Sequence, residues 1–250
     1  MKTEKTSAFI LFLIIFFYSV SNFAQTSIEV NGGADFVSRY VWRGSLVNDA
    51  PNVQPSLSLS YYGFNFGFWG SYSLSKINVS DNDYSLSQEI DTYISYSFKL
   101  NKSMNFSALV TDYYYPLSGI EIGNFNNYDD PNGRGAHTLE LGLLLEGTNS
   151  FPLSFAGYVN IYNDEGNNAY FQIDYSTKVS DYNIDLFVGA AAGSAKNPGY
   201  YGTEKFNVIN LGITANRELK VSNSFSIPVS VSYILNPKAE TSYLIFGLSI

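Results

Sequence analysis

Charged and hydrogen-bonding side chains that could form a selective site recur at even spacings in this sequence. Arg39 and Arg43 are four residues apart, and Glu89, Asp91 and Tyr93 follow each other at intervals of two. Because residues two apart in a strand point to the same face, each set projects from one side of its strand. Basic side chains facing acidic ones across a lumen could set up a transverse field that selects permeating ions. The alternative is a closed network of ion pairs that stabilises the sheet, and both interpretations remain open here.

The elements that carry these residues are predicted to be β-strands, because apolar and polar residues alternate with a period of two. Between Val53 and Tyr61, for example, Val, Pro, Leu and Tyr alternate with Gln and Ser. Twelve segments show this pattern: 37–44, 53–61, 64–74, 90–98, 104–110, 139–145, 153–161, 171–175, 184–190, 209–213, 225–233 and 241–250.

The connections between these segments alternate in length. The short ones lie near 62–63, 99–102, 147–152, 179–181 and 217–224. The others, mostly longer, are 45–52, 77–85, 116–136, 163–168, 194–203 and 236–240. Short periplasmic turns and longer extracellular loops are typical of bacterial outer-membrane barrels.

We therefore predict an all-β fold, an antiparallel transmembrane β-barrel of about twelve strands in the bacterial outer membrane. A soluble β-sandwich or lipocalin-like barrel would produce the same alternation, with the apolar residues facing a core. Twelve strands of this length would then require a very large core, which disfavours the soluble alternative.

The N-terminal segment has the parts of a secretory signal peptide. Lys2 and Lys5 precede the apolar run Ala8–Tyr18, and a small-residue cleavage site follows, so residues 1–24 are predicted to be removed on export. The apolar run is short for a membrane-spanning helix, which needs about 20 residues. Residues 25–250 are predicted to form one domain, the outer-membrane barrel.

Composition excludes several classes of function. Loss of Lys2, Glu4 and Lys5 with the signal peptide changes the net charge from −8 to −9, which argues against nucleic acid as a partner. The sequence contains no cysteine, so disulfides, a lipid-anchored cysteine and thiolate metal sites are excluded. The mean hydropathy of −0.05 with 17% aromatic residues fits strands that are apolar on one face only.

The alternation assigns the polar set of each strand to the lumen and the apolar set to lipid. A charge on the lipid face would cost about 2–4 kcal/mol at mid-depth, so the charges should face inward. The predicted lumen-lining residues are Arg39, Arg43, Gln54, Trp69, Glu89, Asp91, Tyr93, Glu140, Gln172, Asp174 and Asp185. Asp112 breaks the rule, since it shares the phase of Val110, and we place it at the outer membrane interface or after a bulge.

The same phase places Phe36, Ser38, Tyr40 and Trp42 on the lipid face. Aromatic clusters at Tyr40 and Trp42, at Tyr61 and Tyr62, and at 113–115 are interpreted as girdles at the membrane interfaces.

Several motifs carry a family resemblance. The segment Asp35–Gly44 resembles the opening strand of the TorF family, a bacterial family of unknown function whose members are described as candidate porins. Weaker similarity continues at Gly67–Ser71, Glu89–Tyr96, Thr111–Pro116 and Leu211–Thr214. The resemblance implies an outer-membrane barrel with a pore role and no known substrate. Ile250 stands where the family usually ends in an aromatic residue, a feature that bears on recognition by the barrel-assembly machinery.

The longest connection, 116–136, allows three interpretations. It could fold into the mouth as a plug, it could hold a calcium ion through Asp129 and Asp130, or it could be a solvated surface loop. The spacing of the two aspartates does not match a twelve-residue calcium loop, so no metal site is predicted. The surface loop is the preferred interpretation.

An outer-membrane enzyme would need a nucleophile with a positioned base. The only histidine, His137, lacks the serine two residues on that a phospholipase-like pattern requires, and we interpret it as a solvent-facing residue at a strand end. We therefore predict no catalysis and no cofactor.

The predicted function is a passive channel for small hydrophilic solutes or ions, with a mild cation preference from its excess of inward carboxylates. The alternative is a closed structural barrel whose extracellular loops bind a partner.

Overall fold

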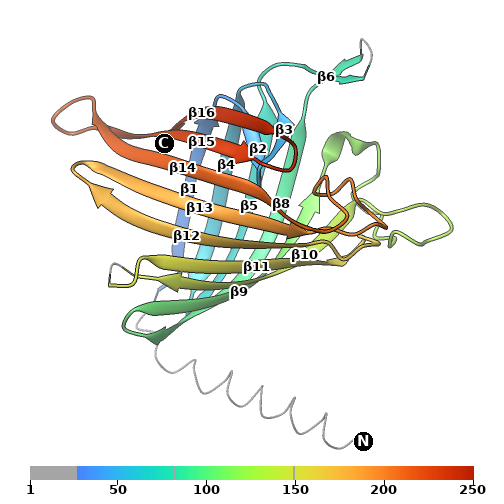
Figure 1. Cartoon of the computed structure of the whole chain (residues 1–250), viewed down its shortest axis with the longest axis horizontal. Coiled ribbons are helices and arrows are strands. Elements are labelled where there is room, and N and C mark those ends of the chain that lie inside the picture. The colour runs from blue at the N-terminus through green and yellow to red at the C-terminus, as the bar shows by residue number, and fades with distance from the viewer. Residues whose placement is uncertain (1–26, 81–82, 149) are drawn as a thin grey trace, which may run out of the picture.

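Twelve strands form one closed antiparallel barrel in the computed structural model, which describes residues 27–80, 83–148 and 150–250 (Figure 1). The predicted signal peptide lies outside the described residues. In chain order the barrel strands are β1 (Glu29–Val37), β4 (Asn52–Tyr61), β5 (Phe64–Ser73), β8 (Gln88–Asn101), β9 (Met104–Tyr114), β10 (His137–Gly147), β11 (Leu153–Tyr162), β12 (Ala169–Val179), β13 (Tyr182–Ala192), β14 (Phe206–Lys220), β15 (Ser226–Asn236) and β16 (Thr241–Ser249). Each strand pairs with its neighbours in this order, and β1 closes the ring against β16. The predicted all-β fold is confirmed.

Closure joins the first and the last strand of the barrel. The amide of Ala34 donates to the carbonyl oxygen of Ile250 at 3.1 Å, and the amide of Ile250 returns the bond at 3.0 Å. Because a closed barrel has no free edge, the backbone polar groups of its wall are paired within the protein, as a hydrocarbon environment requires.

The outer face of the wall is apolar and uncovered. Leu57 and Phe246, which lie on different strands, are 52% and 55% exposed, and Ile94, Phe171 and Leu244 are similarly exposed. The buried residues of the wall are largely polar and face inward. A contiguous apolar exterior of this extent is suited to lipid contact rather than to water. Among the described residues, no helix is long and apolar enough to cross a membrane.

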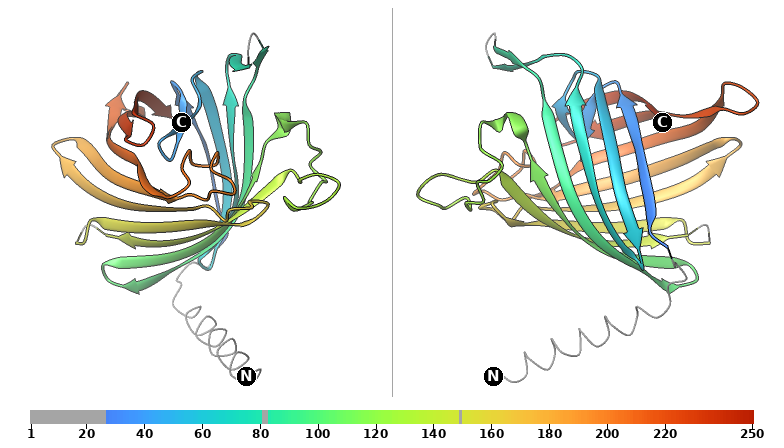
Figure 2. Two further views of the ribbon diagram at one scale, coloured as in Figure 1. Left: turned by 45° about the vertical axis from the view of Figure 1, so that its right-hand side comes forward. Right: turned by 180° about the vertical axis from the view of Figure 1, so that it is seen from behind.

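The short connections gather at one end of the barrel, here called the turn end, and the longer ones at the other, the loop end (Figure 2). Two small hairpins and one 3-10 turn lie in the longer connections. They are β2 (Tyr40–Trp42) with β3 (Ser45–Asn48), β6 (Ile77–Ser80) with β7 (Asp83–Ser85), and η2 (Pro116–Ser118).

The β2–β3 hairpin, residues 40–48, lies inside the barrel, and we call it the lumen hairpin. Tyr40 contacts Trp69 on β5, with ring centroids 5.6 Å apart, while the Gly44 backbone lies against Ile209 on β14. Because β5 and β14 stand on opposite sides of the ring, the hairpin crosses the lumen. The prediction that residues 37–44 form the first barrel strand was therefore wrong: β1 spans Glu29–Val37, and the chain then bends inward.

Candidate functional site in the barrel lumen

Arg43 occupies the turn of the lumen hairpin and forms a buried ion pair with Glu140 on β10. Its Nη1 lies 2.6 Å from Oε2 of Glu140, and its Nη2 lies 2.8 Å from Oε1. Nη1 also donates to the hydroxyl of Tyr201 at 2.5 Å. Glu140 is 1% exposed and accepts a further bond from the Tyr113 hydroxyl at 2.9 Å. Two parallel bonds to one carboxylate fix the guanidinium in position and orientation.

Aromatic rings surround the Arg43 guanidinium. Its Cζ lies 4.4 Å from the ring centroid of Trp42, 4.1 Å from that of Tyr158 and 4.7 Å from that of Tyr170. The electron-rich faces of these rings attract the cation, and more strongly where water is excluded. The hairpin is thus attached to the wall through the charge at its tip.

The backbone of the hairpin turn, next to the ion pair, is also fixed by contacts with the wall. Arg43 and Gly44 both have positive φ angles, 48° and 78°, which close the tight turn. The side-chain amide of Asn236 donates to the Gly44 carbonyl at 3.0 Å. A Cβ atom on Gly44 would lie 1.9 Å from the carbonyl oxygen of Ile209, so only glycine fits this approach.

A cavity of about 370 Å³ lies between the lumen hairpin and the barrel wall. Eleven residues line it: Tyr40, Trp42, Arg43, Trp69, Asp91, Tyr93, Leu109, Thr111, Tyr113, Glu140 and Tyr158. We call it the aromatic cavity. Asp91 is 8% exposed, and its Oδ1 has no hydrogen-bond partner among the described residues.

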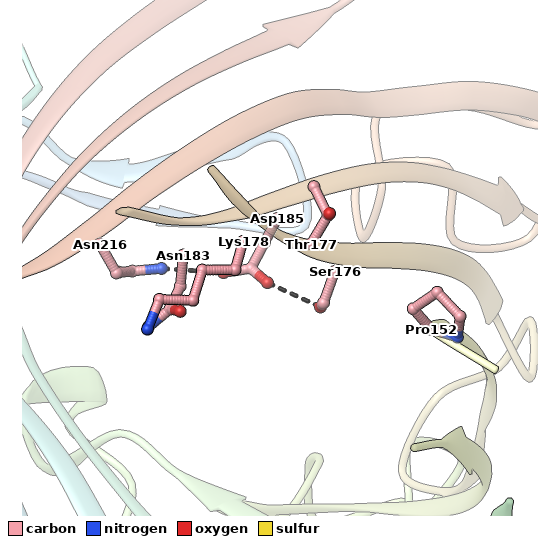
Figure 3. A pocket seen from close by; sticks show the side chains of 7 residues that line it. All are labelled: Pro152, Ser176, Thr177, Lys178, Asn183, Asp185 and Asn216. Atoms are coloured by element: carbon pink, nitrogen blue, oxygen red, sulfur yellow. Dashed lines mark hydrogen bonds between the residues drawn. The ribbon is translucent and has the colours of Figure 1, made fainter. Parts of the chain in front are cut away.

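A larger cavity of about 730 Å³ occupies the turn end of the lumen (Figure 3). Asp185 lies in its wall and accepts hydrogen bonds from Ser176 at 2.7 Å and from Asn216 at 2.8 Å. Lys178 and Asn183 also line it. Aromatic residues therefore dominate the lining of the cavity beside the hairpin, and polar residues dominate the lining at the turn end.

The predicted lumen residues lie in the aromatic cavity, beside it, or elsewhere on the wall. Trp69, Asp91, Tyr93, Arg43 and Glu140 meet at the aromatic cavity. Beside it, Glu89 accepts a bond from Tyr115 at 3.2 Å and Gln54 donates to Ser71 at 3.2 Å. Elsewhere on the wall, Gln172 donates to Asp174 at 2.7 Å, and Asp185 lies at the turn end.

Arg39 and Arg43 do not project together from one strand as predicted. Arg39 lies in the bend after β1, and its Nε has no partner among the described residues, whereas Arg43 reaches Glu140. Tyr40 and Trp42 were predicted to face lipid as girdle residues, and Tyr113 was predicted to belong to a girdle too. These assignments were wrong: Tyr40 and Tyr113 are buried inside the barrel, and Trp42 stacks on Tyr201. The alternation of lumen-facing and lipid-facing residues no longer applies after Ser38, where the chain leaves the barrel wall.

Four tyrosines of this site were missed: Tyr158, Tyr170, Tyr200 and Tyr201. Tyr158 and Tyr170 share the inward phase of Asn160 and Gln172, so alternation alone could have found them. The other two lie in the loop 193–205, where no periodic signal exists.

The loop 116–136 lies on the outer rim and not in the lumen (Figure 1). It packs on His137, whose ring stacks on Phe125 with centroids 4.1 Å apart and whose Nε2 donates to the Ile122 carbonyl at 2.7 Å. The Nδ1 of His137 lies 2.8 Å from the carboxylate of Asp112. His137 is 4% exposed, so the interpretation as a solvent-facing residue was wrong. The out-of-phase Asp112 is explained as its partner.

Replacing Asp112 with alanine is expected to release this loop. The buried Nδ1 of His137 would lose its partner, at a cost of about 1–3 kcal/mol. Trypsin should then cleave after Arg134 several times faster, because the loop segment 116–136 is held less tightly. Asp129→Ala, an exposed change in the same loop, is the control. Equal cleavage of both variants would rule out the anchoring role.

Asp164 ties together two loops at the loop end. Its carboxylate accepts bonds from the side chains of Asn160 at 2.8 Å, Asn168 at 3.0 Å and Asn197 at 2.7 Å. Burial opposes ionisation, but these bonds outweigh it and hold the pKa of the Asp164 carboxyl below its ordinary value.

The stability that Asp164 contributes should therefore depend on pH in one direction. It is fully present above the ordinary carboxyl pKa of about 4 and is lost as the pH falls through the lowered value. We expect Asp164→Asn to reduce the free energy of unfolding by about 1–2 kcal/mol at pH 7. Urea unfolding in micelles should show the two proteins converging in acid. Asp181→Asn, in an exposed turn, should match wild type throughout, and a gap that persists in acid would contradict this assignment.

Comparison with known proteins gives one family and one structural neighbour of interest. A solved structure titled "KdgM porin" has a TM-score of 0.48 and 13% sequence identity, and the alignment covers 87% of this chain and 97% of that one. No curated protein sequence matches. The profile described as "Bacterial protein of unknown function (Gcw_chp)" matches residues 22–241. This match agrees with the description of a bacterial family of unknown function given above. The name TorF remains a resemblance. The chain belongs to the Gcw_chp family.

Proposed function

We propose that this protein is a porin-like channel of the bacterial outer membrane that passes small hydrophilic solutes or ions. The observation that carries the proposal is the lumen itself. A barrel that served only as a scaffold could fill its interior with packed side chains, as eight-stranded barrels do. Here a polar chamber of about 730 Å³ stays open at the turn end. The loop half is spanned by the lumen hairpin, which packs with Tyr201 of the loop 193–205 against the wall residue Tyr170.

The lumen hairpin is the constriction of this channel. It narrows the path from the loop end, which we place outside the cell, and its charged tip meets the wall at Glu140. Asp91, Glu89, Asp174 and Asp185 also face the interior, so these carboxylates with Glu140 outnumber the basic residues Arg43 and Lys178 that line the two cavities. Such a surplus favours cations over anions in the pore.

Single-channel recording of the refolded barrel in a planar bilayer tests the proposal. Discrete current steps are expected, and under a salt gradient the reversal potential should indicate a mild preference for cations. A silent bilayer with protein that is folded by circular dichroism would contradict the channel. That result would favour the second candidate, a closed barrel acting through its outer loops, which the hairpin across the lumen also suits.

A further inference from the structure

The aromatic cavity has the chemistry of a binding site for a positively charged group. Trp69 and Tyr93 supply ring faces from neighbouring strands, and Asp91 supplies a carboxylate from β8. The Oδ1 of Asp91 is shielded from water and has no hydrogen-bond partner among the described residues. A buried carboxylate oxygen without a partner is unfavourable, and a bound cation would remove that cost.

The hairpin already shows what this environment accepts. In the lining of the cavity the guanidinium of Arg43 lies against aromatic rings and pairs with Glu140. The same combination of aromatic rings and a carboxylate recurs in the cavity lining at Trp69, Tyr93 and Asp91, and among the described residues Asp91 forms no ion pair. These three residues thus repeat the residue types that hold the Arg43 guanidinium.

The charge balance around the cavity points the same way. Glu89, Asp91 and Glu140 are all buried, and Arg43 is the basic residue among those that line the cavity. Arg43 is within ion-pair distance of Glu140, while Glu89 is satisfied by the Tyr115 hydroxyl. Asp91 is left for a ligand. A neutral sugar could stack on the same rings but would bring no charge to offset this carboxylate.

We propose that the aromatic cavity binds a small organic cation, a guanidinium or alkylammonium group, with its charge at Asp91 and its body against Trp69 and Tyr93. A volume of about 370 Å³ is at the small end of ligand sites, so the solute is of the size of one such group with a short side chain. As a statement about which solutes enter the channel, this inference rests on the proposed function. As a statement about binding, it is independent of conduction.

The two tryptophans of the sequence, Trp42 and Trp69, both line the cavity, so their fluorescence reports on it directly. The probe is methylguanidinium, titrated into the folded barrel in detergent micelles. N-methylurea has a similar shape without the charge and is the matched control. We expect a saturable change in fluorescence with methylguanidinium and none with N-methylurea or glucose at equal concentrations.

Asp91→Asn is expected to weaken methylguanidinium binding by about tenfold or more, because the charge is lost while the shape is kept. Asp185→Asn, which removes a carboxylate from the chamber at the turn end, should bind like wild type. Equal responses to methylguanidinium and N-methylurea in the wild-type barrel would overturn the inference, whether or not Asp91→Asn folds. So would a response to glucose alone.

The binding and bilayer experiments fail separately. Saturable, charge-dependent binding in micelles with a silent bilayer would retain the site and reject the channel. Current steps without charge-dependent binding would retain the channel and reject the site.

Discussion

A single methyl group at Gly44 is expected to open the loop half of the lumen. In Gly44→Ala the new Cβ would lie 1.9 Å from the Ile209 carbonyl oxygen and 2.8 Å from its carbonyl carbon, both backbone atoms of β14. The backbone of β14 is fixed by its pairing with the neighbouring strands, so the lumen hairpin has to move away from it. The wall strands are paired without the hairpin, and the barrel should stay folded. Single-channel conductance should rise several-fold.

The chain supplies a matched control for this substitution. Gly119 has nearly the same backbone conformation, with φ of 79°, but a Cβ there would meet nothing within 4 Å. Gly119→Ala therefore carries the same conformational strain without the clash. We expect it to conduct like wild type. If both variants conduct alike, the hairpin is not the constriction.

Neutralising Glu140 is expected to have the second large effect. In Glu140→Gln the guanidinium of Arg43 stays buried without its counter-charge, and breaking a buried pair in this way costs about 3–5 kcal/mol. Even the lower figure corresponds to a change of about a hundredfold in the equilibrium between the hairpin bound to the wall and the hairpin detached from it. The channel should spend far more time in its high-conductance state, which recordings at constant voltage measure directly.

The effect of Glu140→Gln should be reversed in part by a second change. Removing both charges, in Arg43→Gln with Glu140→Gln, takes away the unpaired cation and should bring the open time back toward wild type. Glu146→Gln, an inward carboxylate on the same strand that accepts from Ser107, is the control. If Glu146→Gln opened the channel as much as Glu140→Gln, general electrostatics rather than the ion pair would be responsible.

The barrel could be predicted from the sequence because its wall follows one simple rule. Leu57 and Leu59 alternate with serines because one side meets an apolar medium and the other a polar lumen, and most of the wall follows this pattern. Ile209 on β14 departs from it, since it is buried in the interior next to a register shift between β13 and β14. Glu140 and Asp91, which share the inward phase of their strands, both line the aromatic cavity. Periodicity could not show where β1 ends, because Tyr40 and Trp42 resume the phase of Phe36 after one serine.

What stops β1 is its partner rather than its own composition. Val37 pairs with Gly247 on β16, and Ser38 exchanges the last bonds with Phe246 before the chain bends inward. Contacts between residues so far apart in sequence leave no local signal. For the same reason Tyr201, from a loop that follows β13, could not be predicted to reach Arg43.

The lumen hairpin also constrains the order in which the molecule can be built. It follows β1 in the chain, yet its tip contacts Glu140, Tyr201 and Asn236, which are 97 to 192 residues away. Contacts of such large sequence separation form late, because a long loop of chain has to be ordered first. The hairpin can reach these partners only after β14 and β15 are in place. It follows β1 directly in the chain, and β1 is one of the two strands that form the β1–β16 seam. Seating of the hairpin and sealing of the seam are therefore expected to be one coupled, rate-limiting step of assembly.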